Sequence, residues 1–246
     1  MNWWISCLLL FFPVVISGLL VFSIKITDTR LKLILSFSGA YILSLALLHL
    51  LPELYQGQDA EKIGIYILAG FFIQLLLEFF STGIEHGHAH IHTHDKKLPF
   101  SVLIGLFIHS ILEGMPISQK IGHAHEGSIL NFSDSLVLGI ILHNIPISIA
   151  FMSMLLHLGM DKKKAIFYLV LFASMSPLGC MFSQVLNWCG VQNFEQYLKV
   201  ALAVVIGIFL HISTTIMFES SEKNHRYHIS KLISILIGAA LAWGLS

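Results

Sequence analysis

The sequence consists of eight long apolar segments separated by short polar connections. A helix needs roughly 20 mainly apolar residues to cross a bilayer core, and eight segments reach about that length. Backbone groups in lipid must be hydrogen-bonded within the protein, and the alternating pattern of a membrane β-barrel is absent. The sequence therefore predicts an all-α, polytopic membrane protein of eight transmembrane helices, at about residues 3–24, 31–51, 63–80, 100–118, 136–156, 165–188, 198–218 and 229–245.

Composition agrees with a membrane location. Hydrophobic residues make up 56% of the chain and charged residues only 11%, whereas soluble domains carry about 25% charged residues. The formal net charge is zero, so nucleic acid is not an expected partner. Because the connections are short, we expect residues 1–246 to form a single transmembrane domain without a separate soluble domain.

Basic residues are unevenly placed, and this asymmetry predicts the orientation of the chain. Cytoplasmic connections of membrane proteins carry an excess of Lys and Arg. The connections after the first, third, fifth and seventh segments hold Lys25, Arg30, Lys32, Lys96, Lys97, Lys162, Lys163, Lys164, Lys223, Arg226 and Lys231. We therefore expect both termini on the non-cytoplasmic side, the loop 81–99 in the cytoplasm, and a plasma or inner membrane as the location.

Ionisable side chains lie within the fourth and fifth segments, where they are costly and mark ion sites or paths. His109 and Glu113 are four residues apart, so a helix places them on one face. Counted from the helix ends, Glu113, His109 and His143 lie roughly 7, 13 and 10 Å deep, in the same slab of membrane. The sequence therefore predicts one shared cation site at His109, Glu113 and His143, with Asn144 beside it.

The predicted ligands are two imidazoles and one carboxylate. This nitrogen and oxygen set suits zinc, and also Fe²⁺, Mn²⁺, Co²⁺, Ni²⁺ or Cd²⁺, whereas Ca²⁺ and Mg²⁺ prefer oxygen alone. No thiol lies near the set, so copper(I) is not expected. Because these ligands lie within membrane segments, where ionisable groups mark ion paths, the metal is expected as a transported substrate rather than as a cofactor.

Other polar residues interrupt the apolar segments. His49 and Glu53 lie four residues apart at the outer end of the second segment, where either an entrance site or a helix end meeting water accounts for them. His211 lies within the seventh segment and is a candidate path residue. Glu78 is interpreted as helix-end structure.

Histidines alternate with small residues in the expected cytoplasmic loop. Such tracts are typical of metal binding, and we expect this one to bind weakly and without selectivity. We expect the tract to receive transported metal, or to regulate transport by feedback, rather than to carry out the transport step itself. The tract contains His86, His88, His90, His92 and His94.

At these residues the chain resembles the ZIP (Zrt-, Irt-like) family of divalent metal transporters. The fourth segment contains the H-S-x-x-E-G form beginning at His109, the second ends with H-x-x-P-E beginning at His49, and the sixth contains Ser176-Pro-Leu-Gly. The resemblance covers the whole chain. It implies a 3+2+3 arrangement of helices with an inverted repeat, in which the fourth and fifth helices hold the metal, and it implies a homodimer.

The resemblance also implies a two-metal centre, from which this chain departs. The second position would use Ser110, Asn144 and Ser176, and the bridging carboxylate that many members carry on the fifth helix is Ile147 here. We therefore expect one strong site and at most a weaker second one.

The sequence thus predicts a carrier that moves zinc or a related divalent transition metal into the cytoplasm. A metal exporter and a metal-sensing membrane protein remain alternatives. An enzyme is not expected, because the HExxH motif of a membrane metalloprotease is absent.

Overall fold

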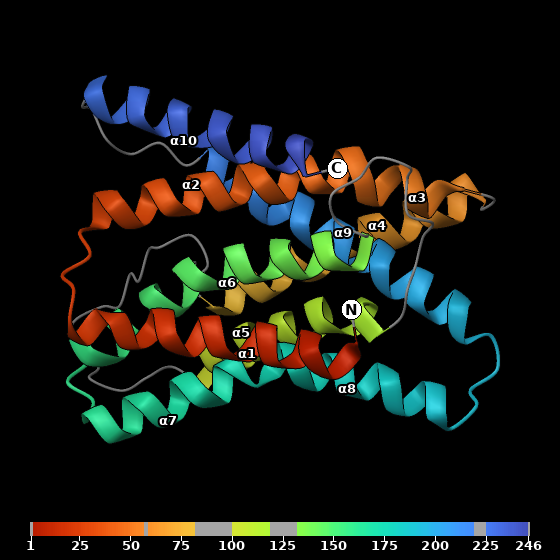
Figure 1. The fold of residues 1–246 in the computed structure, drawn as a ribbon, viewed down its shortest axis with the longest axis horizontal. Coiled ribbons are helices and arrows are strands. Elements are labelled where there is room, and N and C mark those ends of the chain that lie inside the picture. The colour runs from red at the N-terminus through yellow and green to blue at the C-terminus, as the bar shows by residue number, and fades with distance from the viewer. Residues whose placement is uncertain (1, 57–58, 82–99, 119–131, 219–224, 246) are drawn as a thin grey trace.

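A computed structural model describes residues 2–56, 59–81, 100–118, 132–218 and 225–245 of the chain (Figure 1). Every regular element in these ranges is helical. The α-helices are α1 (Trp3–Leu19), α2 (Asp28–Leu45), α3 (Leu51–Tyr55), α4 (Ala60–Ser81), α5 (Phe100–Gly114), α6 (Phe132–His157), α7 (Lys162–Ala173), α8 (Met175–Trp188), α9 (Phe194–Phe218) and α10 (His225–Gly244). Short 3₁₀ turns follow α1 and α5, and a π-helical turn, Ala46–Leu50, joins α2 to α3.

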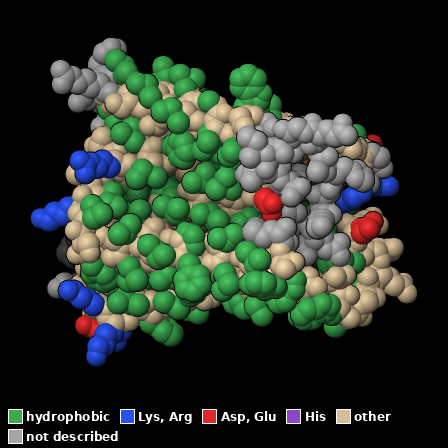
Figure 2. Space-filling view, in the orientation of Figure 1, with side chains coloured by type: hydrophobic (Ala, Val, Ile, Leu, Met, Phe, Trp, Pro, Cys, Tyr) green, Lys and Arg blue, Asp and Glu red, His purple; other side chains and the backbone are tan. Residues whose placement is uncertain are grey.

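Eight helical spans in the described residues are long and apolar enough to cross a membrane. The prediction of an all-α protein with eight transmembrane helices is therefore confirmed. Figure 2 shows hydrophobic side chains over most of the visible described face, with Lys and Arg mainly at one end of the bundle. The spans containing α4 and α10 are only 22% buried within the protein, as expected for helices whose side chains face lipid.

Six spans begin three or four residues earlier than hydropathy predicts, and polar residues cap the starts of α2 and α7 among them. The Thr27 hydroxyl accepts a hydrogen bond from the Arg30 amide at 3.4 Å, and α2 begins at Asp28 rather than near residue 31. The Asp161 carboxylate accepts one from the Lys163 amide at 3.2 Å, and α7 begins at Lys162. Such caps satisfy amide donors that the first helical turn leaves unpaired.

The sixth span is two helices rather than the single helix predicted at 165–188. α7 ends at Ala173, and α8 begins at Met175, after Ser174. Pro177 lies in the first turn of α8, where its missing amide donor removes no helical hydrogen bond. The start of α8 lies against α5. The backbones are so close there that a Cβ atom added at Gly114 would overlap the backbone carbonyl of Ser176.

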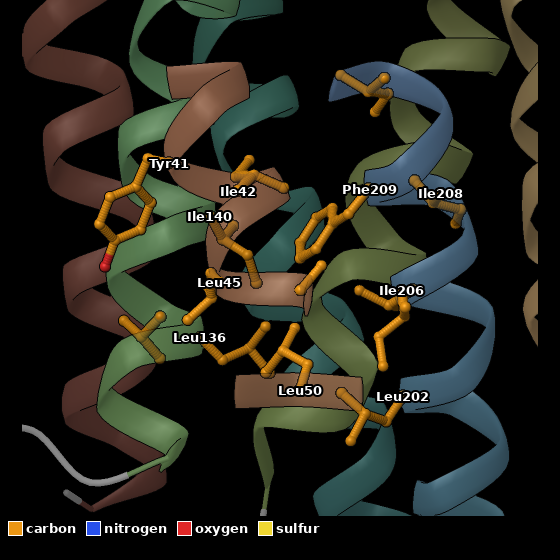
Figure 3. Packing of buried hydrophobic residues seen from close by; sticks show 14 of the residues in the cluster. Tyr41, Ile42, Leu45, Leu50, Leu136, Ile140, Leu202, Ile206, Ile208 and Phe209 are labelled. Carbon is orange, nitrogen blue, oxygen red and sulfur yellow. The ribbon is translucent and has the colours of Figure 1, made fainter. Parts of the chain in front are cut away.

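The helices pack as two groups that meet along α6 and α5. In one group α2 packs against α10 and α9, and α4 packs against α9. In the other, α1 packs against α6, and α5 packs against α8. The groups contact each other where α2 meets α6 and where α4 meets α5. Figure 3 shows the first of these contacts, with Tyr41 and Leu45 of α2 beside Ile140 of α6 and Phe209 of α9.

Glycines allow α4 and α9 to approach each other closely. A Cβ atom at Gly70 would overlap the carbonyl of Val204, and one at Gly207 would overlap the carbonyl of Ile67. Small residues at such crossings permit the backbone contact on which helix packing in membranes depends. This crossing fixes the position of α4, the helix that carries Gln74 and Glu78.

The Gly70→Ala substitution is therefore expected to destabilise the protein. Its methyl group must push α9 away, which should cost about 1–3 kcal/mol and lower the melting temperature in detergent. Gly64→Ala, on the same helix, is the matched control, because nothing lies within 4 Å of the added methyl. Equal melting temperatures for the two variants would contradict the close crossing.

Candidate metal centre

The helix α5 brings two of the predicted ligands together at the centre of the bundle. The imidazole of His109 and the carboxylate of Glu113 lie one turn apart, and both side chains are 0% exposed. The His109 Nε2 atom is 2.9 Å from Glu113 Oε1. The i, i+4 spacing therefore brings the His109 and Glu113 side chains together on one face of the helix, as the sequence predicts.

The helix α6 adds His143 from the opposite side. The rings of His109 and His143 are 5.9 Å apart, centroid to centroid. One ligand atom from each of His109, Glu113 and His143 lies within 4.8 Å of the other two, and all three residues are buried. Tetrahedral zinc with bonds of about 2.0–2.2 Å separates its ligand atoms by about 3.3 Å. Modest side-chain rotations would therefore bring this set around one cation.

Asn144 orients the carboxylate of Glu113. Its Nδ2 donates a hydrogen bond to Glu113 Oε2 at 3.3 Å, so that Oε1 is left facing His109. The Oδ1 atom of Asn144 and the Oγ atom of Ser110 are buried and have no hydrogen-bond partner among the described residues. Buried polar atoms without partners are uncommon in folded proteins and indicate a place for an ion or water.

Gln74 of α4 contacts the site, and the sequence analysis did not identify it. The amide is fully buried, and its Oε1 lies 3.0 Å from His109 Nδ1. An amide oxygen only accepts hydrogen bonds, so Nδ1 of His109 carries the proton that it donates. The lone pair of a neutral His109 is then on Nε2, directed at Glu113.

Two acceptor atoms therefore face each other in a buried site. A neutral His109 Nε2 and an ionised Glu113 Oε1 at 2.9 Å repel unless a positive charge lies with them. A proton on Nε2 supplies that charge, and so does a metal cation bound by both atoms. The geometry is thus suited to a cation that can compete with a proton.

The residues of the expected weaker second position lie on helices α5, α6 and α8. Ser110 is on the buried face of α5, and Ser176 is in the first turn of α8 beside Gly114. Ile147 is fully buried and packs in an apolar cluster that includes Val14 and Phe151. The position where many relatives would have a carboxylate is therefore part of the apolar core.

The remaining candidates lie elsewhere or outside the described residues. His49 is in the π-helical turn of the second span, and Glu53 in α3 accepts a hydrogen bond from Gln56 at 3.3 Å. Neither joins a group of three metal-binding side chains within the described part of the chain. His211 pairs with Glu78, which lies about one turn before the end of α4, so Glu78 contacts a neighbouring helix in addition to its place near the helix end. The tract His86–His94 lies outside the described residues.

The Gln74→Leu substitution tests the orientation of His109. It removes the acceptor of the Nδ1 proton, and loss of such supporting contacts typically lowers metal affinity about 10–100-fold. Gln74→Glu keeps an acceptor and should retain tight binding. Zinc affinity is measured by competition with a chelating dye, with Gln196→Leu at an exposed position as control. Unchanged affinity in Gln74→Leu would contradict this role.

Comparison with known proteins identifies the family. The model of the ZIP zinc transporter family matches residues 98–246, which is more than half of the chain and includes α5 and α6. A search of curated proteins found no match. The resemblance seen in the motifs is confirmed: the chain belongs to the ZIP zinc transporter family.

Proposed function

We propose that this membrane protein carries zinc, or a related divalent transition metal, into the cytoplasm by binding it between His109, Glu113 and His143. Membership of the ZIP family makes the chain a divalent metal transporter. The observation that carries the proposed site is the fully buried pair of His109 Nε2 and Glu113 Oε1, 2.9 Å apart. The metal is the substrate of this site.

The chemistry of the three ligands supports zinc without excluding its neighbours. Two imidazoles and a carboxylate form the kind of ligand set found in open zinc sites, in which a further position stays available for water or substrate. The order of affinities among divalent metals does not by itself exclude Fe²⁺, Mn²⁺, Co²⁺ or Cd²⁺. These ions are therefore expected competitors for uptake.

The charge of the site favours release as well as binding. One carboxylate and two neutral imidazoles leave a divalent cation with a single uncompensated positive charge. Burying uncompensated charge is costly, so the ion is held less tightly than in a site with a second carboxylate. A transporter must let its substrate go, and Ile147 in the apolar cluster is consistent with one such site.

The proposed inward direction of transport agrees with the expected orientation. Most Lys and Arg residues lie in alternate connections, and this asymmetry predicts both termini outside and the His tract in the cytoplasm. An inward carrier would then deliver the metal on the side where the tract can receive it.

Substitution of the ligands provides the first functional test. His109→Ala, Glu113→Ala or His143→Ala should each lower zinc uptake into proteoliposomes by about tenfold or more, since even supporting residues change metal sites by that amount. The three effects should not add, because the ligands act together. His157→Ala is the control, at an exposed position on α6. Near-normal uptake by Glu113→Ala, or export instead of uptake, would contradict the proposal.

The number of tightly bound ions is a second test. A variant with the five tract histidines changed to Ser should bind one zinc ion tightly per chain, measured by elemental analysis after dialysis. Ile147→Glu adds a carboxylate one turn from His143 and should increase binding or slow release. If the variant that carries only the five His→Ser changes binds two zinc ions tightly, the single-site proposal is wrong.

The His tract is expected to affect capacity more than transport. Changing all five histidines to Ser should remove weak zinc binding but alter uptake only modestly. Zinc must displace protons from imidazole, so the weak binding should fall as the pH drops through about 6.5, where free histidine titrates. Uptake abolished as fully as in His109→Ala would place the tract in the transport path.

A further inference from the structure

A second pair of metal-binding side chains lies between α4 and α9. The His211 Nε2 atom is 2.5 Å from Glu78 Oε2, and the two side chains are 7% and 23% exposed. The ring of Phe71 packs edge-on against His211, with centroids 4.7 Å apart. The carboxylate and imidazole are the same two donor types as in Glu113 and His109.

The pair is displaced from the metal centre along a single helix. Gln74, which contacts His109, and Glu78 are four residues apart on α4 and so share one face. Glu78 is about one turn from Ser81, where α4 ends and the chain continues toward the His tract. The polar groups on α4 therefore lead from the metal centre toward Ser81, where α4 ends.

Holding α4 to α9 does not require this pair. The two helices already touch at backbone distance through Gly70 and Gly207, one to two turns away from Glu78 and His211. An ionisable pair within a membrane segment is costly and is typical of an ion path. A structural role as a link between helices is therefore a weak explanation.

Both members of the pair are suited to take up an ion. The carboxylate of Glu78 is 23% exposed, so it is not sealed within the protein as the carboxylate of Glu113 is. The Nδ1 atom of His211 is buried and has no hydrogen-bond partner among the described residues. A cation between Nε2 and the carboxylate requires the two to separate to about 3.3 Å, which rotation of the Glu78 side chain can provide.

We propose that Glu78 and His211 form a second cation site, which a divalent transition metal occupies transiently after leaving His109, Glu113 and His143. This inference rests on the proposed function, because it concerns the path of the same substrate. As a transit site it should bind more weakly than the main centre, since it offers two ligands from the described residues rather than three.

Zinc binding and uptake by the full-length protein with the five tract histidines changed to Ser test the site. Equilibrium dialysis should show one tight and one weaker ion. Glu78→Gln should remove only the weaker ion and lower the maximal uptake rate about tenfold, a loss typical of disturbed metal sites. Glu195→Gln, an exposed carboxylate on α9, should change neither. A Glu78→Gln protein that binds and transports zinc normally would overturn the inference.

A second variant separates metal binding from a purely structural role. His211→Cys replaces imidazole with thiolate, a softer ligand that favours Cd²⁺, so the ratio of Cd²⁺ to Zn²⁺ uptake should rise several-fold. An unchanged ratio, or a lower melting temperature with unaltered zinc binding, would show that the pair only holds helices. Normal zinc uptake by His109→Ala would contradict the proposed main centre itself, independently of the result for Glu78→Gln.

Discussion

The site depends on one electrostatic constraint, which is that two acceptor atoms face each other at a fully buried position. Gln74 Oε1 accepts a hydrogen bond from His109 Nδ1, so the lone pair of a neutral His109 is on Nε2, directed at Glu113 Oε1, 2.9 Å away. In a low-dielectric interior such a contact is unfavourable without a positive charge. A site that must hold either a proton or a metal ion is suited to exchange one for the other, which is what cation transport through a bilayer needs.

The fold imposes this constraint through contacts that are distant in sequence. α5 supplies the pair, α6 supplies His143, and Asn144 holds the second carboxylate oxygen. Gln74 comes from α4, in the other group of helices, and α4 is held by its glycine crossing with α9. The metal centre is thus assembled where the two groups meet, so that a shift of one group against the other would alter the environment of the ion.

Local patterns in the sequence predicted most of the fold and the grouping of His109, Glu113 and His143, but not the contact that Gln74 makes with them. Apolar length predicted the eight spans, and the spacing of His109 and Glu113 predicted their contact, because both depend only on helix geometry. Gln74 and the Glu78–His211 pair were missed because they depend on which helices are neighbours, and a lone amide in an apolar segment does not indicate its partner. The break at Ser174 was also missed, because hydropathy continues across it, although Pro177 marks the position.

Zinc X-ray absorption spectroscopy tests the central claim most directly. The protein with its five tract histidines changed to Ser and loaded with one equivalent of zinc should show two imidazole nitrogens at about 2.0–2.1 Å and a carboxylate oxygen at about 2.0–2.2 Å. The imidazole signal should fall by about half in His143→Ala, since one of two rings is lost. A spectrum that is unchanged in both His109→Ala and His143→Ala would show that the ion is bound elsewhere.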